Sequence, residues 1–60
     1  MTQFRVVFWY VDAWNADYDG FRETVVQAIG PDDAVRQFKK EYPGRVGQEH
    51  TIQFVEEVEE

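Results

Sequence analysis

Cysteine and serine are both absent from the 60-residue sequence. Without cysteine the chain cannot form disulfides, hold zinc through thiolates or use a thiol nucleophile, and without serine it cannot carry a serine-based catalytic arrangement. No run approaches the roughly 20 apolar residues that a membrane-spanning helix needs. The first residues lack the basic and apolar regions of a secretory signal peptide. These absences favour a cytoplasmic protein, because a reducing compartment suits a chain without disulfides.

Basic residues are also scarce. Six Lys and Arg residues face twelve Asp and Glu residues, which gives a formal net charge of −6 at pH 7. Proteins that bind nucleic acid use basic side chains to displace counterions from phosphates, and anionic membranes attract basic segments. The composition therefore argues against direct binding to DNA, RNA or a membrane. An acidic protein favours a basic partner instead, and it can occupy a surface built for nucleic acid.

Aromatic residues are abundant for so short a chain, with five Phe, three Tyr and two Trp. This content favours an ordered globular domain over a disordered segment. We expect one domain spanning residues 1–60, and a domain of this size buries only about 60% of the surface of its unfolded chain. Some of the aromatic surface must therefore remain outside the core.

Three segments have the composition of β-strands: residues 3–11, which include FRVVFWYV, residues 21–29 and residues 49–58. The segment DAWNADYDG, residues 12–20, forms a long acidic loop between the first two strands. Its Asp19-Gly20 pair suits the positive φ of a tight turn. The first two strands are therefore predicted to form an antiparallel hairpin.

A helix is predicted in the segment IGPDDAVRQFKKEYPG. Gly30 can serve as the N-cap and Pro31 as the first helical residue, and the two aspartates that follow favour the positive end of the helix dipole. Two lysines lie near the negative end, and Pro43-Gly44 ends the helix. The apolar residues recur at intervals of three and four and form one stripe, which consists of Ala34, Val35, Phe38 and Tyr42.

The order strand, strand, helix, strand predicts an α+β fold, in which a three-stranded antiparallel sheet carries one helix on one face (ββαβ). A helix of this length covers one face of the sheet and leaves the other open. The terminal run EEVEE is strongly acidic, so residues 56–60 are predicted to form a frayed, solvated tail.

The first strand is apolar on both faces, although successive side chains of a strand point to opposite sides of the sheet. The residues predicted beneath the helix are Val6, Phe8, Tyr10, Thr24, Val26, Ala28, Ile52 and Phe54. The residues predicted on the open face are Val7, Trp9, Val11, Phe21, Val25 and Val55, with Arg5, Glu23, Gln27 and Gln53 between them. A slip of one residue in register would exchange the two faces of a strand.

The candidate sites for chemistry are incomplete. The loop NADYDG, residues 15–20, resembles the start of a calcium-binding loop, but Val26 stands where a bidentate Glu is needed. His50 is the single histidine, and its neighbours Glu49 and Thr51 point to the opposite face of the strand, so we interpret it as a surface or edge residue. The acidic pairs lack a pocket that would separate their pKa values. We therefore predict no catalytic, metal-binding or cofactor-binding residue.

An interaction surface is the stronger prediction, because large aromatic residues with a polar edge are enriched at interfaces. No segment of the chain remains to cover Trp9, whereas Trp14 and Tyr18 of the hairpin loop can either contact a partner or fold back over the core. The predicted interface consists of Val7, Trp9, Val11, Trp14, Tyr18, Phe21, Val25 and Val55. An acidic rim is predicted at Asp12, Asp17, Asp19, Glu56 and Glu57.

The segment TVVQAIGPDDAVRQFKKEYPG, followed by HTIQFVEEVEE, combines a strand that ends in V-x-A, a capped helix that begins D-D-A, and a returning strand. This pattern resembles the phage-encoded inhibitors of bacterial RNA polymerase and the archaeal ribosomal protein LX family. The resemblance implies the strand, strand, helix, strand order and a phage-type or small accessory protein. The inhibitor family relies on arginines in its final strand, where this chain has Thr51, Gln53, Glu56 and Glu57. The ribosomal family is basic and binds RNA, so the resemblance implies no particular target.

These observations favour a small acidic protein-binding domain without enzymatic activity, such as a phage-type inhibitor or accessory protein. It would bind a foreign protein, basic or itself nucleic-acid-binding, through the open sheet face and the acidic rim. The alternative is a homodimeric structural or assembly domain, in which the open face pairs with another copy of the chain. Neither hypothesis requires a cofactor.

Overall fold

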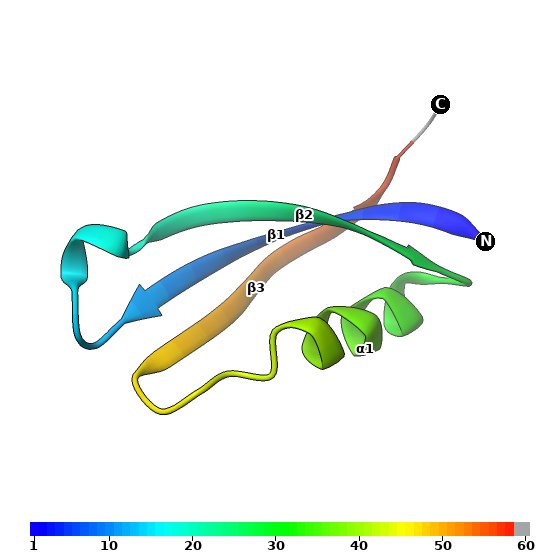
Figure 1. Ribbon diagram of the computed structural model, residues 1–60. Helices are drawn as coiled ribbons and strands as arrows, with labels where there is room; N and C mark the ends of the chain where they lie inside the picture. The colour runs from blue at the N-terminus through cyan, green and yellow to red at the C-terminus, as the bar shows by residue number, and fades with distance from the viewer. Residues whose placement is uncertain (59–60) are drawn as a thin grey trace.

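In a computed structural model that describes residues 1–58, the chain forms one sheet and one α-helix. The elements follow in the order β1 (Thr2–Asp12), the short 3₁₀ helix η1 (Ala16–Tyr18), β2 (Gly20–Ala28), α1 (Pro31–Glu41) and β3 (Gln48–Glu57). The strands of the described chain pair antiparallel in the order β2-β1-β3, and α1 packs against the sheet (Figure 1). The predicted α+β fold with ββαβ order is confirmed.

Strand β1 lies at the centre of the sheet although it comes first in the chain. β2 pairs with residues 2–10 of β1, and β3 pairs with residues 4–12. The N-terminus and the end of β3 therefore lie at one end of the molecule, and η1 lies at the other (Figure 1).

Helix α1 begins and ends where the sequence predicts. Gly30 is the N-cap and Pro31 is the first helical residue. Proline lacks a backbone N–H, but at this position no residue makes an intrahelical hydrogen bond through its N–H, so the helix loses nothing. Two aspartates in the first turn and two lysines in the last turn oppose the charges at the ends of the helix dipole. Tyr42 is the C-cap, and its backbone N–H donates to the Phe38 carbonyl oxygen at 2.8 Å. No helix in residues 1–58 is long and apolar enough to cross a membrane.

β1 and β2 are joined by the long loop that the sequence predicts, but the Asp19-Gly20 pair does not adopt the positive φ expected of it. Gly20 belongs to β2, and the glycines with positive φ in the described chain are Gly44 and Gly47. The chain reverses through η1, where the Asn15 side chain accepts a hydrogen bond from the Asp17 backbone N–H at 3.1 Å. Asn side chains favour such local bonds to the backbone, so the loop turns without a two-residue hairpin turn.

Strand β3 contains a β-bulge at position 53. Two successive residues of β1, Val7 and Phe8, pair with Phe54 and Ile52, so β3 has one extra residue at this point. Because of the extra residue, Ile52 and Val55 both pack against the core, whereas Phe54 lies on the opposite face with 47% of its surface exposed. The predictions that placed Phe54 beneath the helix and Val55 on the open face are therefore wrong.

The core lies between α1 and the face of the sheet that it covers. Its buried residues are Phe4, Val6, Phe8, Val26, Ala28, Ala34 and Phe38, and Tyr10, Tyr42, Ile52 and Val55 pack around them. The ring of Phe8 lies 4.9 Å from that of Phe38 and 5.5 Å from that of Tyr42, measured between centroids. The central strand and the apolar stripe of the helix therefore supply five of these seven buried residues, and β2 supplies the other two.

Strand β3 continues into the predicted tail. Arg5 forms an ion pair with Glu56, and the Val58 backbone N–H donates to the Gln3 carbonyl oxygen at 2.9 Å. Glu56 and Glu57 therefore belong to the sheet, where the sequence predicted a frayed segment. The rest of the predicted tail, residues 59–60, lies outside the described residues.

Candidate interaction surface

The sheet face opposite α1 carries no other element of residues 1–58, and we call it the open face. Strand pairing and the bulge place six apolar side chains on it, which are Val7, Trp9, Val11, Phe21, Val25 and Phe54. The sequence predicted the position of each of them except Phe54. Strict alternation along β3 cannot locate Phe54, because the extra residue shifts the pattern by one. The available signal was the spacing of three between Ile52 and Val55, which a bulge brings to one face.

The aromatic centre of the open face is a cross-strand pair. Trp9 of β1 lies directly opposite Phe21 of β2, with ring centroids 4.8 Å apart and ring planes at 78°. This edge-to-face arrangement is the favoured geometry for two aromatic rings. Trp9 is half-buried, whereas 67% of the surface of Phe21 is exposed. On β3 the residue directly opposite Trp9 is the small Thr51.

Arg5 adds a positive charge to this apolar face. Its guanidinium lies 3.2 Å from the carboxylate of Glu23 on β2 and also forms an ion pair with Glu56 on β3. The same group lies 6.0 Å from the centroid of the Phe54 ring. These ion pairs are more than one-third exposed, so we expect at most about 1 kcal/mol of stabilisation from each. Their main effect is to hold a cation in place between two carboxylates.

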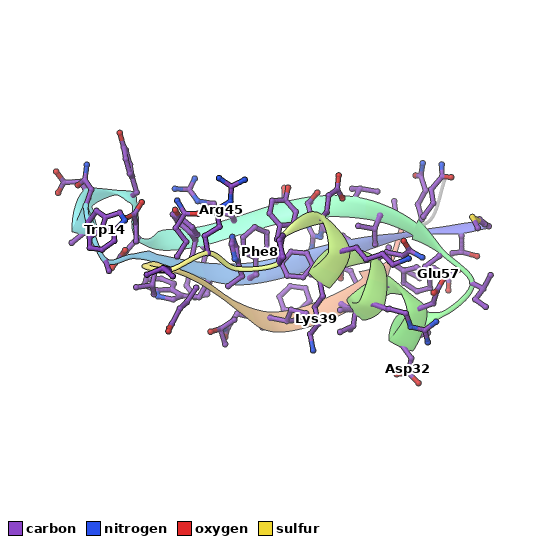
Figure 2. All side chains as sticks on the ribbon, turned by 60° about the horizontal axis from the view of Figure 1, so that its bottom comes forward. Phe8, Trp14, Asp32, Lys39, Arg45 and Glu57 are labelled. Carbon is purple, nitrogen blue, oxygen red and sulfur yellow. The ribbon has the colours of Figure 1, made fainter. Side chains whose placement is uncertain are left out.

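Trp14 and Tyr18 lie in the hairpin loop, with 76% and 56% of their surfaces exposed. Neither side chain covers the core. Trp14 lies instead against Gly47 in the loop between α1 and β3, where an added Cβ would come within 2.9 Å of the indole. The Ala13 backbone N–H also donates to the Gly47 carbonyl oxygen at 2.6 Å. Figure 2 shows Trp14 at the opposite end of the molecule from Glu57.

The predicted acidic rim divides into internal and exposed carboxylates. Asp12 is only 9% exposed and accepts hydrogen bonds from the Tyr10 hydroxyl at 3.1 Å and the Trp14 backbone N–H at 2.9 Å. Asp19 accepts a hydrogen bond from the Asp12 backbone N–H at 2.8 Å, so both carboxylates organise the hairpin loop. Burial and the hydrogen bond to Asp12 raise the pKa of the Tyr10 hydroxyl. The prediction that Asp12 belongs to an exposed rim is wrong, and the exposed members of the rim are Asp17, Asp19, Glu56 and Glu57.

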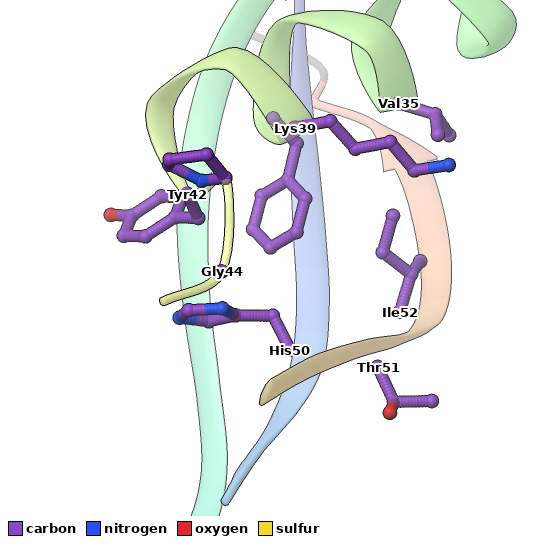
Figure 3. Close-up of a pocket in the computed structure, with 9 residues that line it drawn as sticks. Val35, Lys39, Tyr42, Gly44, His50, Thr51 and Ile52 are labelled. Carbon is purple, nitrogen blue, oxygen red and sulfur yellow. The ribbon is translucent and has the colours of Figure 1, made fainter. Parts of the chain in front are cut away.

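An open groove of about 580 Å³ lies on the other side of the molecule, between the end of α1 and β3. Figure 3 shows Tyr42 and His50 on one side of it and Val35 and Ile52 on the other. The Lys39 side chain extends along its upper rim. The groove continues the edge of the core and offers mainly apolar walls.

His50 lies on the edge strand β3, as predicted, but its ring is half-buried among aromatic side chains. Its centroid lies 5.5 Å from Phe8, 5.2 Å from Tyr10 and 5.4 Å from Tyr42. Burial lowers the pKa of His50, and its Nδ1 atom has no hydrogen-bond partner in the described chain. An imidazole held neutral in this way packs against the aromatic rings around it.

The described chain contains no group of three or more His, Cys, Asp or Glu residues that could hold a metal ion. In the loop that resembles a calcium site, the side-chain oxygens of Asn15 and Asp19 accept hydrogen bonds from backbone N–H groups. These bonds identify Asn15 and Asp19 as turn-forming residues.

Comparison with known proteins gives no assignment. No protein-family model, no curated protein and no solved structure matches the chain.

Proposed function

We propose that this protein is a small acidic domain that binds another protein through its open face and has no catalytic activity of its own. The observation that carries the proposal is the set of six apolar side chains on a sheet face that no element of residues 1–58 covers. Exposed apolar patches of this kind mark interaction sites, because monomeric soluble proteins rarely leave them uncovered. A cytoplasmic, phage-type inhibitor or accessory protein is the kind of molecule that fits this proposal.

The composition of the open face supports a protein partner. Trp9 and Arg5 belong to the residue types that dominate binding energy at interfaces, where a fixed aromatic group and a guanidinium contact a partner with little loss of conformational entropy.

The charges around the face indicate the chemistry of the partner. Glu23 and Glu56 flank Arg5, and Glu49 lies opposite Val11 at the other end of the face. With a net charge of −6, the protein would be steered toward a basic surface. The partner we propose is therefore a protein with an apolar patch and a basic rim, such as one that itself binds nucleic acid.

A matched pair of tryptophan variants tests this proposal. Trp9→Gln removes the aromatic centre of the open face, whereas Trp14→Gln removes an equally large side chain from the hairpin loop. In affinity capture from a lysate of the source organism, the wild type and the Trp14 variant should retain the same partner, and the Trp9 variant should lose it. Raising the salt concentration should weaken capture, because a basic rim is screened by ions.

A third variant distinguishes loss of binding from loss of folding. Phe54→Gln alters a side chain that is already 47% exposed on the open face, so circular dichroism should show an intact fold while capture falls. Undiminished capture by folded Trp9 and Phe54 variants would contradict the open face as the binding surface. Association of the purified wild type that depends on Trp9, with no foreign protein captured, would instead favour the homodimeric assembly domain.

A further inference from the structure

The two outer edges of the sheet differ in how well they are protected against further pairing. β3 carries the bulge and four acidic or amide residues near its ends, including Glu49, Glu56 and Glu57. Bulges and charged side chains are the features that prevent an edge strand from accepting another strand. β2 pairs with β1 without a register shift, contains no proline, and carries only two charged residues, Arg22 and Glu23. Its outer edge therefore remains available for backbone hydrogen bonding in the described chain.

Exposed apolar side chains also gather along β2. Phe21 and Val25 lie on the open face with 67% and 53% of their surfaces exposed, and Ile29, directly after the strand, is 82% exposed. The three residues are spaced four apart, with Glu23 and Gln27 between them. Within β2, the positions of Phe21, Glu23, Val25 and Gln27 alternate between apolar and polar on the open face, and Ile29 follows directly after the strand.

We propose that the outer edge of β2 pairs antiparallel with β2 of a second copy of the chain, which joins the two sheets into one. A two-fold axis normal to the sheet keeps both open faces on the same side and places Val25 opposite Val25 of the second copy. In this register Glu23 lies opposite Gln27 of the second copy, and Phe21 lies beside its Ile29. Apolar residues meet apolar residues, and no like charges face each other.

Neighbouring registers are less favourable. Moving the axis one residue toward either end of β2 places Val25 opposite Glu23 or opposite Gln27. Moving it to Glu23 places two carboxylates directly opposite each other, which is destabilising in a sheet. The sequence of β2 is therefore self-complementary about Val25, and this complementarity identifies a second copy as the occupant of the edge.

This inference goes beyond the proposed function, because it uses the strand edge and leaves the open face free. Pairing at β2 would join the two open faces into one surface with Trp9 and Phe21 repeated on both sides of the axis. A partner with two equivalent basic sites would then contact both copies at once.

Cysteine cross-linking tests the register directly, since the natural chain contains no cysteine. Across an antiparallel pair, opposed Cα atoms lie about 4.5–5.5 Å apart, which is within the range for a disulfide. Val25→Cys should therefore form a covalent dimer under mild oxidation. Gln27→Cys is the control, because the two copies of position 27 would be offset by four residues along the strands, or about 14 Å. Equal cross-linking of the two variants, or none in either, would overturn the proposal.

Charge variants at Gln27 give an independent test in solution. Gln27→Glu places two carboxylates opposite the two copies of Glu23, and Gln27→Lys places two ammonium groups there. Sedimentation equilibrium should show dimerisation weakened by the first change and strengthened by the second, each by about 2- to 30-fold, as expected for two cross-strand pairs. Gln53→Glu and Gln53→Lys change the net charge equally on β3 and should shift the dimerisation constant less.

The outcomes separate the two proposals. A wild-type chain that stays monomeric up to about 1 mM, where any association would be weaker than about 4 kcal/mol, contradicts the edge pairing and leaves the proposed protein partner intact. If self-association is lost in Trp9→Gln but unchanged in the Gln27 variants, the two copies contact each other through the open face instead. Cross-linking at position 25 without partner capture by the open face supports the edge pairing and contradicts the proposed function.

Discussion

Single residues hold the hairpin loop between β1 and β2 in place. The sequence predicts Asp12 as a surface carboxylate, because it follows a predicted strand and precedes a turn. In the structure it is buried and accepts hydrogen bonds from the Tyr10 hydroxyl and the Trp14 backbone N–H. Its role depends on where the hairpin loop returns, which a local pattern does not contain. The role of Gly47 also depends on a distant part of the chain, because it faces the indole of Trp14, which is more than thirty positions away.

Gly47→Ala should destabilise the protein, because Gly47 combines a φ of 83° with an indole 2.9 Å from the position of a Cβ. We expect a loss of about 1–3 kcal/mol in the free energy of unfolding, since a side chain is strained at positive φ and Trp14 must also move. Gly20→Ala is the matched control, because nothing lies within 4 Å of its Cβ position and its φ is not positive. Equal stability of the two variants in urea unfolding would show that the contact between Trp14 and Gly47 does not constrain the loop.

Among the secondary-structure elements, α1 could be predicted closely, whereas for β3 the bounds could be predicted but not the directions of its side chains. The limits of the helix depend on residues at or directly beside its ends, since Gly30, Pro31 and the Pro43-Gly44 pair act through local backbone geometry. The side-chain directions of β3 depend on a bulge that forms against β1. Strict alternation therefore predicted the existence of the strand correctly and the facing of Phe54 and Val55 incorrectly.

The bulge makes a testable distinction between two adjacent residues. Val55→Asp should place a carboxylate against the core and lower the free energy of unfolding by at least about 2 kcal/mol. Phe54→Asp adds the same charge on the exposed open face, next to Arg5, and should cost less than about 1 kcal/mol. Chemical denaturation of both variants measures the difference. The reverse order of stability would mean that β3 alternates regularly and that the bulge is absent in solution.

At the scale of the whole molecule, the two-sided apolar character of β1 predicted an uncovered face correctly. One helix cannot wrap a sheet, and the residues on the far side of β1 are visible in the sequence as Val7, Trp9 and Val11. The contribution of β2 to that face also followed from alternation, because β2 contains no bulge. The aromatic cluster around His50 did not follow, since it gathers side chains from β1, the end of α1 and β3.

That cluster predicts how the stability of the whole protein varies with pH. Burial lowers the pKa of His50 below its ordinary value, so between that value and the folded pKa the unfolded chain binds a proton that the folded chain does not. Stability should therefore fall as the pH drops from about 7 through the ordinary histidine pKa of about 6.5. His50→Phe keeps an aromatic ring and removes the titration, so its stability should change less over this window. Greater stability of the wild type at pH 6 than at pH 7.5 would show that the surrounding rings favour the cation instead.

The central position of β1 also has a consequence for how the chain reaches its fold. One neighbour of β1 is the next strand, but the other, β3, ends the described chain, and Phe4 pairs with Glu57. Contacts that span nearly the whole chain form late, because the loop they close is long. A nascent chain that has made β1 and β2 but neither α1 nor β3 would expose one edge of FRVVFWYV and both of its apolar faces at once. The interval before β3 is synthesised is therefore when the chain is most prone to aggregate, and it is when binding by a chaperone would matter most.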